Sequence, residues 1–256
     1  MKDCIKKIII MVVVFCVPLV MNACTDTALQ KKQAELFLNK GISYIQLNQY
    51  NSALKDLLEA EKYYTDDPRI HYYLGMVYHA KDMKPKAMEE FQKAIDIDDN
   101  YSEAHNYLGT LYSDDGLWDK AIAEFDKALL NPMYETPAVP LYNAGWAYYS
   151  KKDYKNALAK YNAAISKEPM TAIRPQIEKN IGLVYFDQGN TTDAILHFQK
   201  SLELNSYLYD AQFFLGECYL KIKDKANAKK AFQAVIKLAP QSPFGKKAKD
   251  YLQSMK

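Results

Sequence analysis

The sequence has 256 residues, with 33 basic and 31 acidic side chains and a formal net charge of +2. Apolar residues make up 49 % of the chain, a composition typical of an ordinary globular protein rather than a disordered one or an array of membrane spans. The near-neutral charge argues against binding nucleic acid by phosphate neutralisation. Arg69 and Arg174 are the only arginines available for bidentate phosphate contacts, so we expect no nucleic-acid partner.

The N-terminal segment has the pattern of an export signal. Three lysines precede an apolar run over 8–21, which is shorter than the roughly 20 residues that a bilayer-spanning helix needs. The run ends at Ala23-Cys24, which resembles the lipobox of bacterial lipoproteins, where the cysteine is lipidated and becomes the new N-terminus. We expect a signal peptide over 1–23, lipid on Cys24 and a short linker over 24–33, with ordinary signal cleavage as the alternative.

Six glycines recur every 34 to 37 residues and define a repeat. Each glycine is followed by a tyrosine after three residues and by an alanine after twelve, and a large apolar or aromatic residue stands four beyond each alanine. The glycines are Gly41, Gly75, Gly109, Gly145, Gly182 and Gly216, and the large residues are Leu57, Phe91, Phe125, Tyr161, Phe198 and Phe232. A glycine without a side chain lets a second helix approach closely, so we expect the large residue to fill the space above it.

This pattern resembles the tetratricopeptide repeat. The resemblance implies an all-α fold, a right-handed superhelical solenoid of six helix-turn-helix repeats that bury their apolar faces by stacking. The repeats occupy 34–241, and a polar-faced capping helix follows over 242–256. The individual repeats are 34–67, 68–101, 102–135, 138–171, 175–208 and 209–241.

Two joints between repeats are longer than the others and rich in proline, over 131–140 and 168–175. Proline at these joints predicts a local change of stacking angle. We therefore expect the solenoid to divide there, into groups of three, one and two repeats or into two groups of three.

The first helix of each repeat lines a concave groove in this architecture. Three positions face the groove: three residues before the glycine, one after it and four after it. The predicted binding residues are Leu38, Ile42, Ile45, Tyr72, Met76, His79, Tyr142, Trp146, Tyr149, Leu183 and Phe186. Their apolar character predicts recognition of a helix or an extended segment of an apolar protein partner. For each of these residues, packing of helix against helix is the alternative interpretation.

Residues that could carry chemistry are few. His71 and His105 share one repeat position, where the family has a core aromatic residue, and Cys218 lies in a helical stretch among small and apolar residues. We interpret the two histidines as half-buried structural residues and Cys218 as a small buried core residue. The sequence has no HExxH zinc motif, no GxSxG motif and no glycine-rich phosphate loop. It therefore predicts no enzyme, no metal, no cofactor and no small-molecule substrate.

A narrower resemblance comes from the combination of a lipobox-like signal, six repeats and a lengthened joint between the third and fourth. With these features and the stretches 128–137 and 142–149, the chain is similar to the pilotins of type IV pili, the PilF, PilW and Tgl type. The resemblance implies an outer-membrane lipoprotein at the periplasmic face that localises the pilus secretin and helps it to assemble. Thr25, rather than aspartate, after Cys24 points to the same membrane by resemblance to enterobacterial sorting.

Two alternatives remain open. One is a general envelope scaffold, similar to the lipoproteins of outer-membrane barrel assembly or to adaptors of peptidoglycan hydrolases. The other is an envelope enzyme with an accessory repeat domain, although the repeats occupy nearly all of the chain after the signal.

Overall fold

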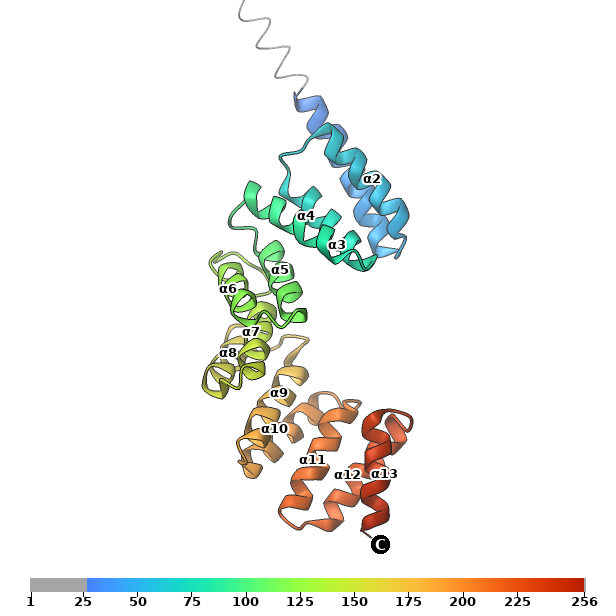
Figure 1. The fold of residues 1–256 in the computed structure, drawn as a ribbon, viewed down its shortest axis with the longest axis vertical. Helices are drawn as coiled ribbons and strands as arrows, with labels where there is room; N and C mark the ends of the chain where they lie inside the picture. The colour runs from blue at the N-terminus through green and yellow to red at the C-terminus, as the bar shows by residue number, and fades with distance from the viewer. Residues whose placement is uncertain (1–26, 256) are drawn as a thin grey trace, which may run out of the picture. The chain divides into compact units, whose positions relative to one another are not determined.

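The computed structural model describes residues 27–255, and every regular element in this range is a helix (Figure 1). The predicted signal peptide over 1–23 and Cys24 lie outside the described residues. A first helix covers 27–46. The others are α2 (Tyr50–Tyr63), α3 (Pro68–Ala80), α4 (Lys84–Ile97), α5 (Ser102–Asp114), α6 (Trp118–Ala128), α7 (Ala138–Ser150), α8 (Tyr154–Lys167), α9 (Arg174–Asp187), α10 (Thr191–Leu204), α11 (Tyr209–Lys221), α12 (Lys225–Leu238) and α13 (Pro243–Ser254). Among these helices we find none whose length and hydropathy would let it span a bilayer.

The helices form consecutive antiparallel pairs, and at the seam inside each pair a glycine packs against a large side chain, Leu57 in the first pair and an aromatic ring in the other five. A Cβ atom on Gly75 would lie 2.7 Å from Cε1 of Phe91, and one on Gly145 would lie 2.5 Å from Cε1 of Tyr161. Both rings are fully buried, so they have no room to move away. The predicted pairing of glycine with a large side chain, and the all-α helix-pair repeat fold, are therefore confirmed.

Each helix pair turns at a residue in the left-handed conformation, seven positions after the repeat glycine. These residues are Asn48, Asp82, Gly116, Lys152, Gly189 and Lys223. The next N–H group returns to the carbonyl oxygen of the repeat tyrosine, as Met83 does to Tyr78 at 2.9 Å. This bond closes the C-terminus of the first helix and fixes the entry to the second.

Two compact units divide the chain, one ending at Ala104 and the other beginning at His105. The predicted divisions at the two proline-rich joints are wrong. Phe125 of α6 shares a core cluster with Ala144 of α7 across the first of these joints. A second core cluster joins α7 and α8 to α9. Packing across both joints continues because the extra residues are accommodated in surface turns.

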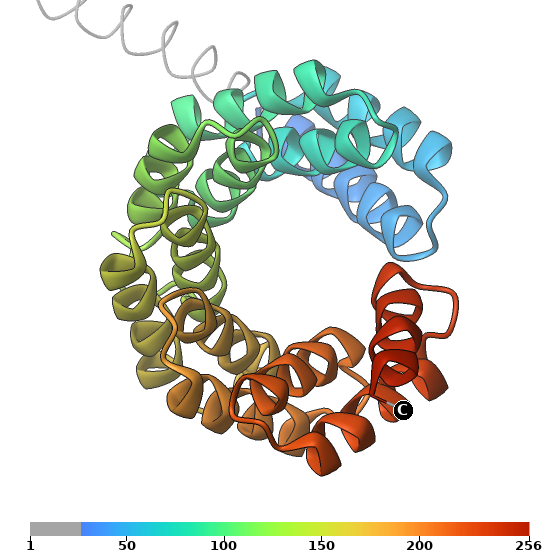
Figure 2. The ribbon, with the colours of Figure 1, turned by 60° about the horizontal axis from the view of Figure 1, so that its bottom comes forward.

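In the second unit the first helices of successive pairs are neighbours. Helix α9 lies against α7 and α11, and α11 lies against α13. Figure 2 shows the helices of this unit, coloured from green to red, in two layers, with the first helices on the inner, concave side. Helix α13 covers the last pair, where the ring of Tyr251 stacks on Phe232 with centroids 4.8 Å apart.

Candidate protein-binding surface

Trp146 of α7 is the most exposed of the aromatic residues predicted to bind a partner. Its side chain retains 40 % exposure, and its ring centroid lies 5.3 Å from that of Tyr149, one helical turn later. Residues three apart on a helix share a face, so the two rings form one aromatic platform. An exposed tryptophan on an inner helix layer is the kind of side chain that anchors protein partners.

A hydrogen bond to Asp187 of α9 fixes the position of Tyr149. The Tyr149 hydroxyl donates to Oδ2 of Asp187 at 2.7 Å. Burial, followed by the neighbouring Asp187 carboxylate, raises the pKa of Tyr149. The phenol therefore stays protonated and can donate throughout the physiological range, which joins α7 to α9 at this surface.

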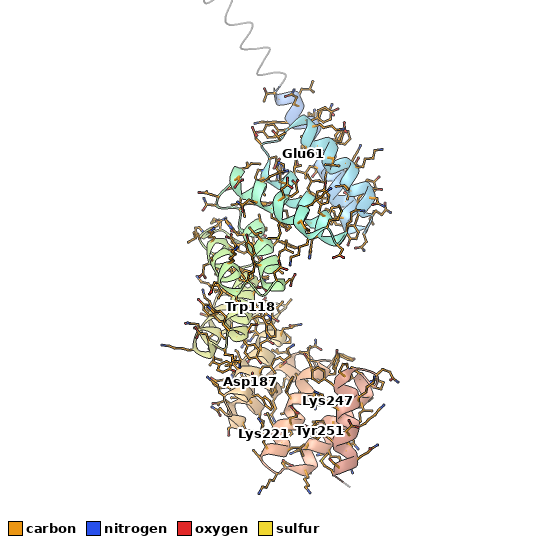
Figure 3. The ribbon with its side chains drawn as sticks, viewed as in Figure 1. Glu61, Trp118, Asp187, Lys221, Lys247 and Tyr251 are labelled. Carbon is orange, nitrogen blue, oxygen red and sulfur yellow. The ribbon has the colours of Figure 1, made fainter. Side chains whose placement is uncertain are left out.

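Phe186 extends the platform from α9 to α11. Its ring lies 5.5 Å from that of Phe214, and the Lys221 ammonium lies 3.5 Å from the Phe186 ring centroid. Figure 3 labels Asp187 on α9 and Lys221 on α11. We name this set the aromatic surface; its members are Trp146, Tyr149, Phe186, Asp187 and Lys221. It combines apolar area with one carboxylate and one ammonium, which suits an apolar segment that also carries polar groups.

Sequence analysis did not identify Asp187 or Lys221 as part of this surface. Both stand five residues after a repeat glycine, directly after the last position assigned to the groove. A wider window on the first helix would have found them. Tyr142 and Leu183, which were predicted, are half-buried: the Tyr142 ring lies 6.0 Å from Tyr161, and Leu183 packs against the core of α10 and α11.

The first unit presents its predicted residues differently. Ile42 and Ile45 are half-buried against the core of the first two pairs. The Tyr72 ring lies 5.4 Å from Tyr101 in an edge-to-face contact, Met76 is half-buried and His79 is exposed. The prediction that Leu38 binds a partner is wrong, because its side chain is fully buried and no partner can reach it. The position three before the glycine faces the neighbouring helix there, so the alternative of helix packing applies.

Three histidine–glutamate pairs bridge the two helices of a repeat and occupy the same two positions, four before and fifteen after the glycine. The pairs are His71–Glu90 at 2.8 Å, His105–Glu124 at 2.6 Å and His197–Glu178 at 2.7 Å, with the two residue types exchanged in the last. His71 and His105 were predicted to be half-buried, and both are buried. The separation of 19 residues between each histidine and a glutamate was the sequence signal for these pairs.

Glu61 joins His71 and Glu90 in a cluster whose ligand atoms lie within 4.8 Å of one another. Nδ1 of His71 donates to the Glu90 carboxylate, and Nε2 donates to the carbonyl oxygen of Thr65 at 3.0 Å. Both acceptors lack hydrogens, so this arrangement suits the doubly protonated ring, which keeps no lone pair for a metal. Lys93 adds a second cation 2.9 Å from Glu90. The cluster is thus an ion-pair network that holds the two helices together.

Cys218 is fully buried, which confirms its interpretation as a core residue. Burial raises the pKa of the thiol to about 12. The thiolate that reactive cysteines need is therefore scarce at neutral pH.

Comparison with known proteins identifies the family of this repeat. One tetratricopeptide repeat model matches residues 108–173 and 179–243, and other models of the same repeat match 41–82, 68–101 and 90–123. The chain belongs to the tetratricopeptide repeat family. Tetratricopeptide repeat proteins are typically scaffolds for protein interactions, so the aromatic surface is a candidate for protein binding.

Two solved tetratricopeptide repeat structures cover nearly the same length. PilF of Pseudomonas aeruginosa is 14 % identical and has a TM-score of 0.77 over 89 % of this chain and 99 % of PilF. PilW, described as a widely conserved type IV pilus biogenesis factor, is 20 % identical with a TM-score of 0.75 over 84 % of this chain and 97 % of PilW. At these identities the likeness establishes a shared fold.

A human relative matches a shorter stretch. The intraflagellar transport protein 88 homolog of Homo sapiens is 30 % identical over 108 residues, which is 41 % of this chain. The matched region spans only 13 % of that relative's length.

Proposed function

We propose that this protein is a non-enzymatic pilotin: an outer-membrane lipoprotein, anchored through lipid on Cys24, that localises the type IV pilus secretin and supports its assembly. The observation that carries the proposal is the match in length and fold to PilW, a type IV pilus biogenesis factor. The lipobox-like Ala23-Cys24 pair supports the anchor.

The aromatic surface supports a mechanism in which the protein acts by binding a partner and carries out no chemical step. Trp146 and Phe186 supply apolar area, while the bond between Tyr149 and Asp187 holds the platform in one arrangement before a partner arrives. A preorganised surface loses little conformational entropy on binding. A secretin segment would be held there during delivery, and lipid chains on Cys24 would keep the complex at the membrane.

Fractionation of secretin multimers tests this proposal. A strain lacking the gene is complemented with the parent chain, with Cys24→Ala or with Trp146→Ala, and the secretin is followed in inner- and outer-membrane fractions. We expect multimers to disappear on deletion, to collect in the inner membrane with Cys24→Ala and to decrease with Trp146→Ala.

A matched surface variant, Leu117→Ala, controls for a general loss of exposed apolar area, since Leu117 is an exposed residue of an intra-repeat turn and is not a member of the aromatic surface. Secretin multimers that are unaffected by deletion would overturn the pilotin proposal. The general envelope scaffold would then take its place.

A further inference from the structure

Five turns that follow the second helix of a repeat, from the second repeat to the sixth, share one hydrogen bond. In each, the N–H of the fourth residue donates to the carbonyl oxygen of the first, with distances between 3.1 and 3.4 Å. These turns are 98–101, 131–134, 168–171, 205–208 and 239–242. The third residue of each turn is exposed; these residues are Asn100, Met133, Met170, Tyr207 and Gln241.

Three consecutive turns of the second unit expose large apolar residues at this third position. Met133 is 82 % exposed, Met170 is 95 % exposed and Tyr207 is 76 % exposed. Leu130 and Leu204, which directly precede two of the turns, are also exposed. The turns on either side carry polar Asn100 and Gln241 instead. We name the five apolar residues of these turns the apolar edge.

Folding does not require apolar residues at these positions. The side-chain oxygen of Asn131 accepts from the N–H of Met133 at 2.9 Å, and Asn205 accepts from Tyr207 at 3.0 Å. Asp98 makes the same bond to Asn100, whose side chain is polar. The first residue therefore sets the turn, and the exposed apolar side chain adds nothing to it. Such side chains in a row on a soluble surface mark an interaction site.

The three turns lie at the same edge of the second unit. Helices α7, α9 and α11 are successive neighbours in one layer, and each of these turns precedes the start of one of them. Equivalent helices of stacked repeats run in the same direction, so their starts share an edge.

Charged residues are few in these turns. Over 130–136, 167–172 and 204–209 they are Glu135, Lys167 and Glu168, and the Arg174 guanidinium reaches the second turn, where it donates to the carbonyl oxygen of Pro169 at 2.9 Å. The Glu168 carboxylate already accepts from the N–H of Ala138 at 2.8 Å. The edge therefore offers no cluster of basic groups for an anionic surface, and few charges would have to be desolvated on entering an apolar medium.

We propose that the apolar edge docks into the interface of a lipid bilayer, at the boundary between neutral headgroups and acyl chains. Because the side chains of Met133, Met170 and Tyr207 touch little of their own protein, they form no wall or pocket around a partner. A protein would need one matching pocket for each turn, whereas a fluid interface accepts separate side chains in any arrangement. Tyrosine suits this boundary because its ring is apolar and its hydroxyl is polar.

This docking rests on the membrane location proposed above. It adds a second contact with the membrane to the one made by the lipid on Cys24. The lipid would hold the protein near the membrane, and the apolar edge would fix the orientation of the second unit. The aromatic surface, on the inner helix layer, would remain open to a protein partner.

A reporter at a turn tests the proposal directly. The full chain with Cys24→Ala, so that no acyl group is attached, carries Met170→Trp and is mixed with phosphatidylcholine vesicles that contain brominated acyl chains. Ile222→Trp, at an exposed apolar residue of an intra-repeat turn on the opposite edge, is the matched control. Both variants share the N-terminal segment and the native Trp118 and Trp146, so these contributions are common to both.

We expect the indole of Met170→Trp to shift to shorter emission wavelength and to lose fluorescence to the brominated lipid, while Ile222→Trp changes little. Equal behaviour of the two reporters, or no quenching of Met170→Trp, overturns the docking.

Vesicle flotation provides a second readout. Combined Met133→Ser, Met170→Ser and Tyr207→Ser should lower the partition coefficient by about tenfold for each side chain withdrawn. Combined Leu117→Ser and Ile222→Ser should leave it unchanged. An unchanged partition coefficient with loss of secretin multimers would assign the edge to a protein and overturn the bilayer proposal. Neither vesicle result depends on the secretin assay, so the two proposals can fail separately.

Discussion

The seam inside each helix pair and the apolar edge of the second unit place large apolar side chains in opposite settings. At the seam, Tyr161 is fully buried against Gly145. At the edge, Met170 is almost fully exposed in a turn that a polar residue can occupy equally well in other repeats. The seam residue is therefore determined by packing, and the edge residue is free for a role other than folding.

The largest effect should come from emptying the seam. Tyr161→Ala removes a fully buried ring, and we expect the free energy of unfolding to fall by about 4 kcal/mol. Met170→Ala should change it by less than about 0.5 kcal/mol, because the side chain has few contacts to lose. Urea unfolding followed by circular dichroism measures both. Similar losses in the two variants would contradict the contrast between seam and edge.

Breaking a histidine–glutamate pair should have the next largest effect. Glu178 has a side chain that is only 3 % exposed and binds both His197 and Arg174. Glu178→Ala leaves the half-buried His197 and Arg174 without the carboxylate that both of them contact, and we expect a loss of about 3 kcal/mol in the free energy of unfolding. Glu203→Ala, at an exposed glutamate of α10, is the matched control and should be nearly neutral.

The same pairs predict how stability depends on pH. Hydrogen bonds from His71 and Lys93, acting against burial, lower the pKa of Glu90; His105 and Lys127 do the same for Glu124. A lowered carboxyl pKa stabilises the fold above the unfolded value of about 4.3, and this contribution is lost as pH falls through the folded pKa. We expect a shallower acid decline in stability for Glu90→Gln than for the parent.

His71 contributes in the opposite direction. Its hydrogen bonds to Glu90 and Thr65 outweigh burial and raise its pKa. This stabilisation is complete below the unfolded pKa of about 6.5 and is lost as pH rises through the folded pKa. The stability difference between the parent and His71→Gln should therefore shrink as pH increases above neutrality. A constant difference across that range would mean that the ring is neutral in the fold.

Trp146→Ala should affect binding more than folding. Loss of an exposed aromatic anchor should weaken partner binding by about 2 kcal/mol, while the helix signal in circular dichroism stays unchanged. Calorimetric titration with a secretin segment measures the first effect. A collapse of helix content would instead assign Trp146 to the core.

The smallest effect should be a gain. Lys152 adopts φ of 61° in the turn between α7 and α8, where Gly189 occupies the equivalent position of the next repeat with φ of 79°. Lys152→Gly removes the steric cost of the left-handed conformation, and we expect about 1 kcal/mol of added stability. Lys151→Gly, one residue earlier in a right-handed conformation, should destabilise and serves as the control.

The extent of sequence-based prediction differed between the seam and the surfaces. Gly145 and Tyr161 were predictable as partners because each repeat shows the same two residue classes at the same spacing. The exposure of Trp146 and the burial of Leu38 were not, although both were assigned to one groove, from the positions one after and three before the glycine. Small rotations of a helix decide whether such a side chain meets a neighbouring helix or solvent.

The sequence by itself determined the repeat, its helices, the close approach at each glycine and the buried state of Cys218. These features depend on local periodicity and on contacts within one repeat, so a short stretch of sequence is sufficient to specify them. Only the tertiary structure decided the boundary after Ala104, the glutamate partners of the histidines, the link from Tyr149 to Asp187 and the exposed row of turns. These features depend on how helices distant in sequence pack together, and no single repeat specifies that packing.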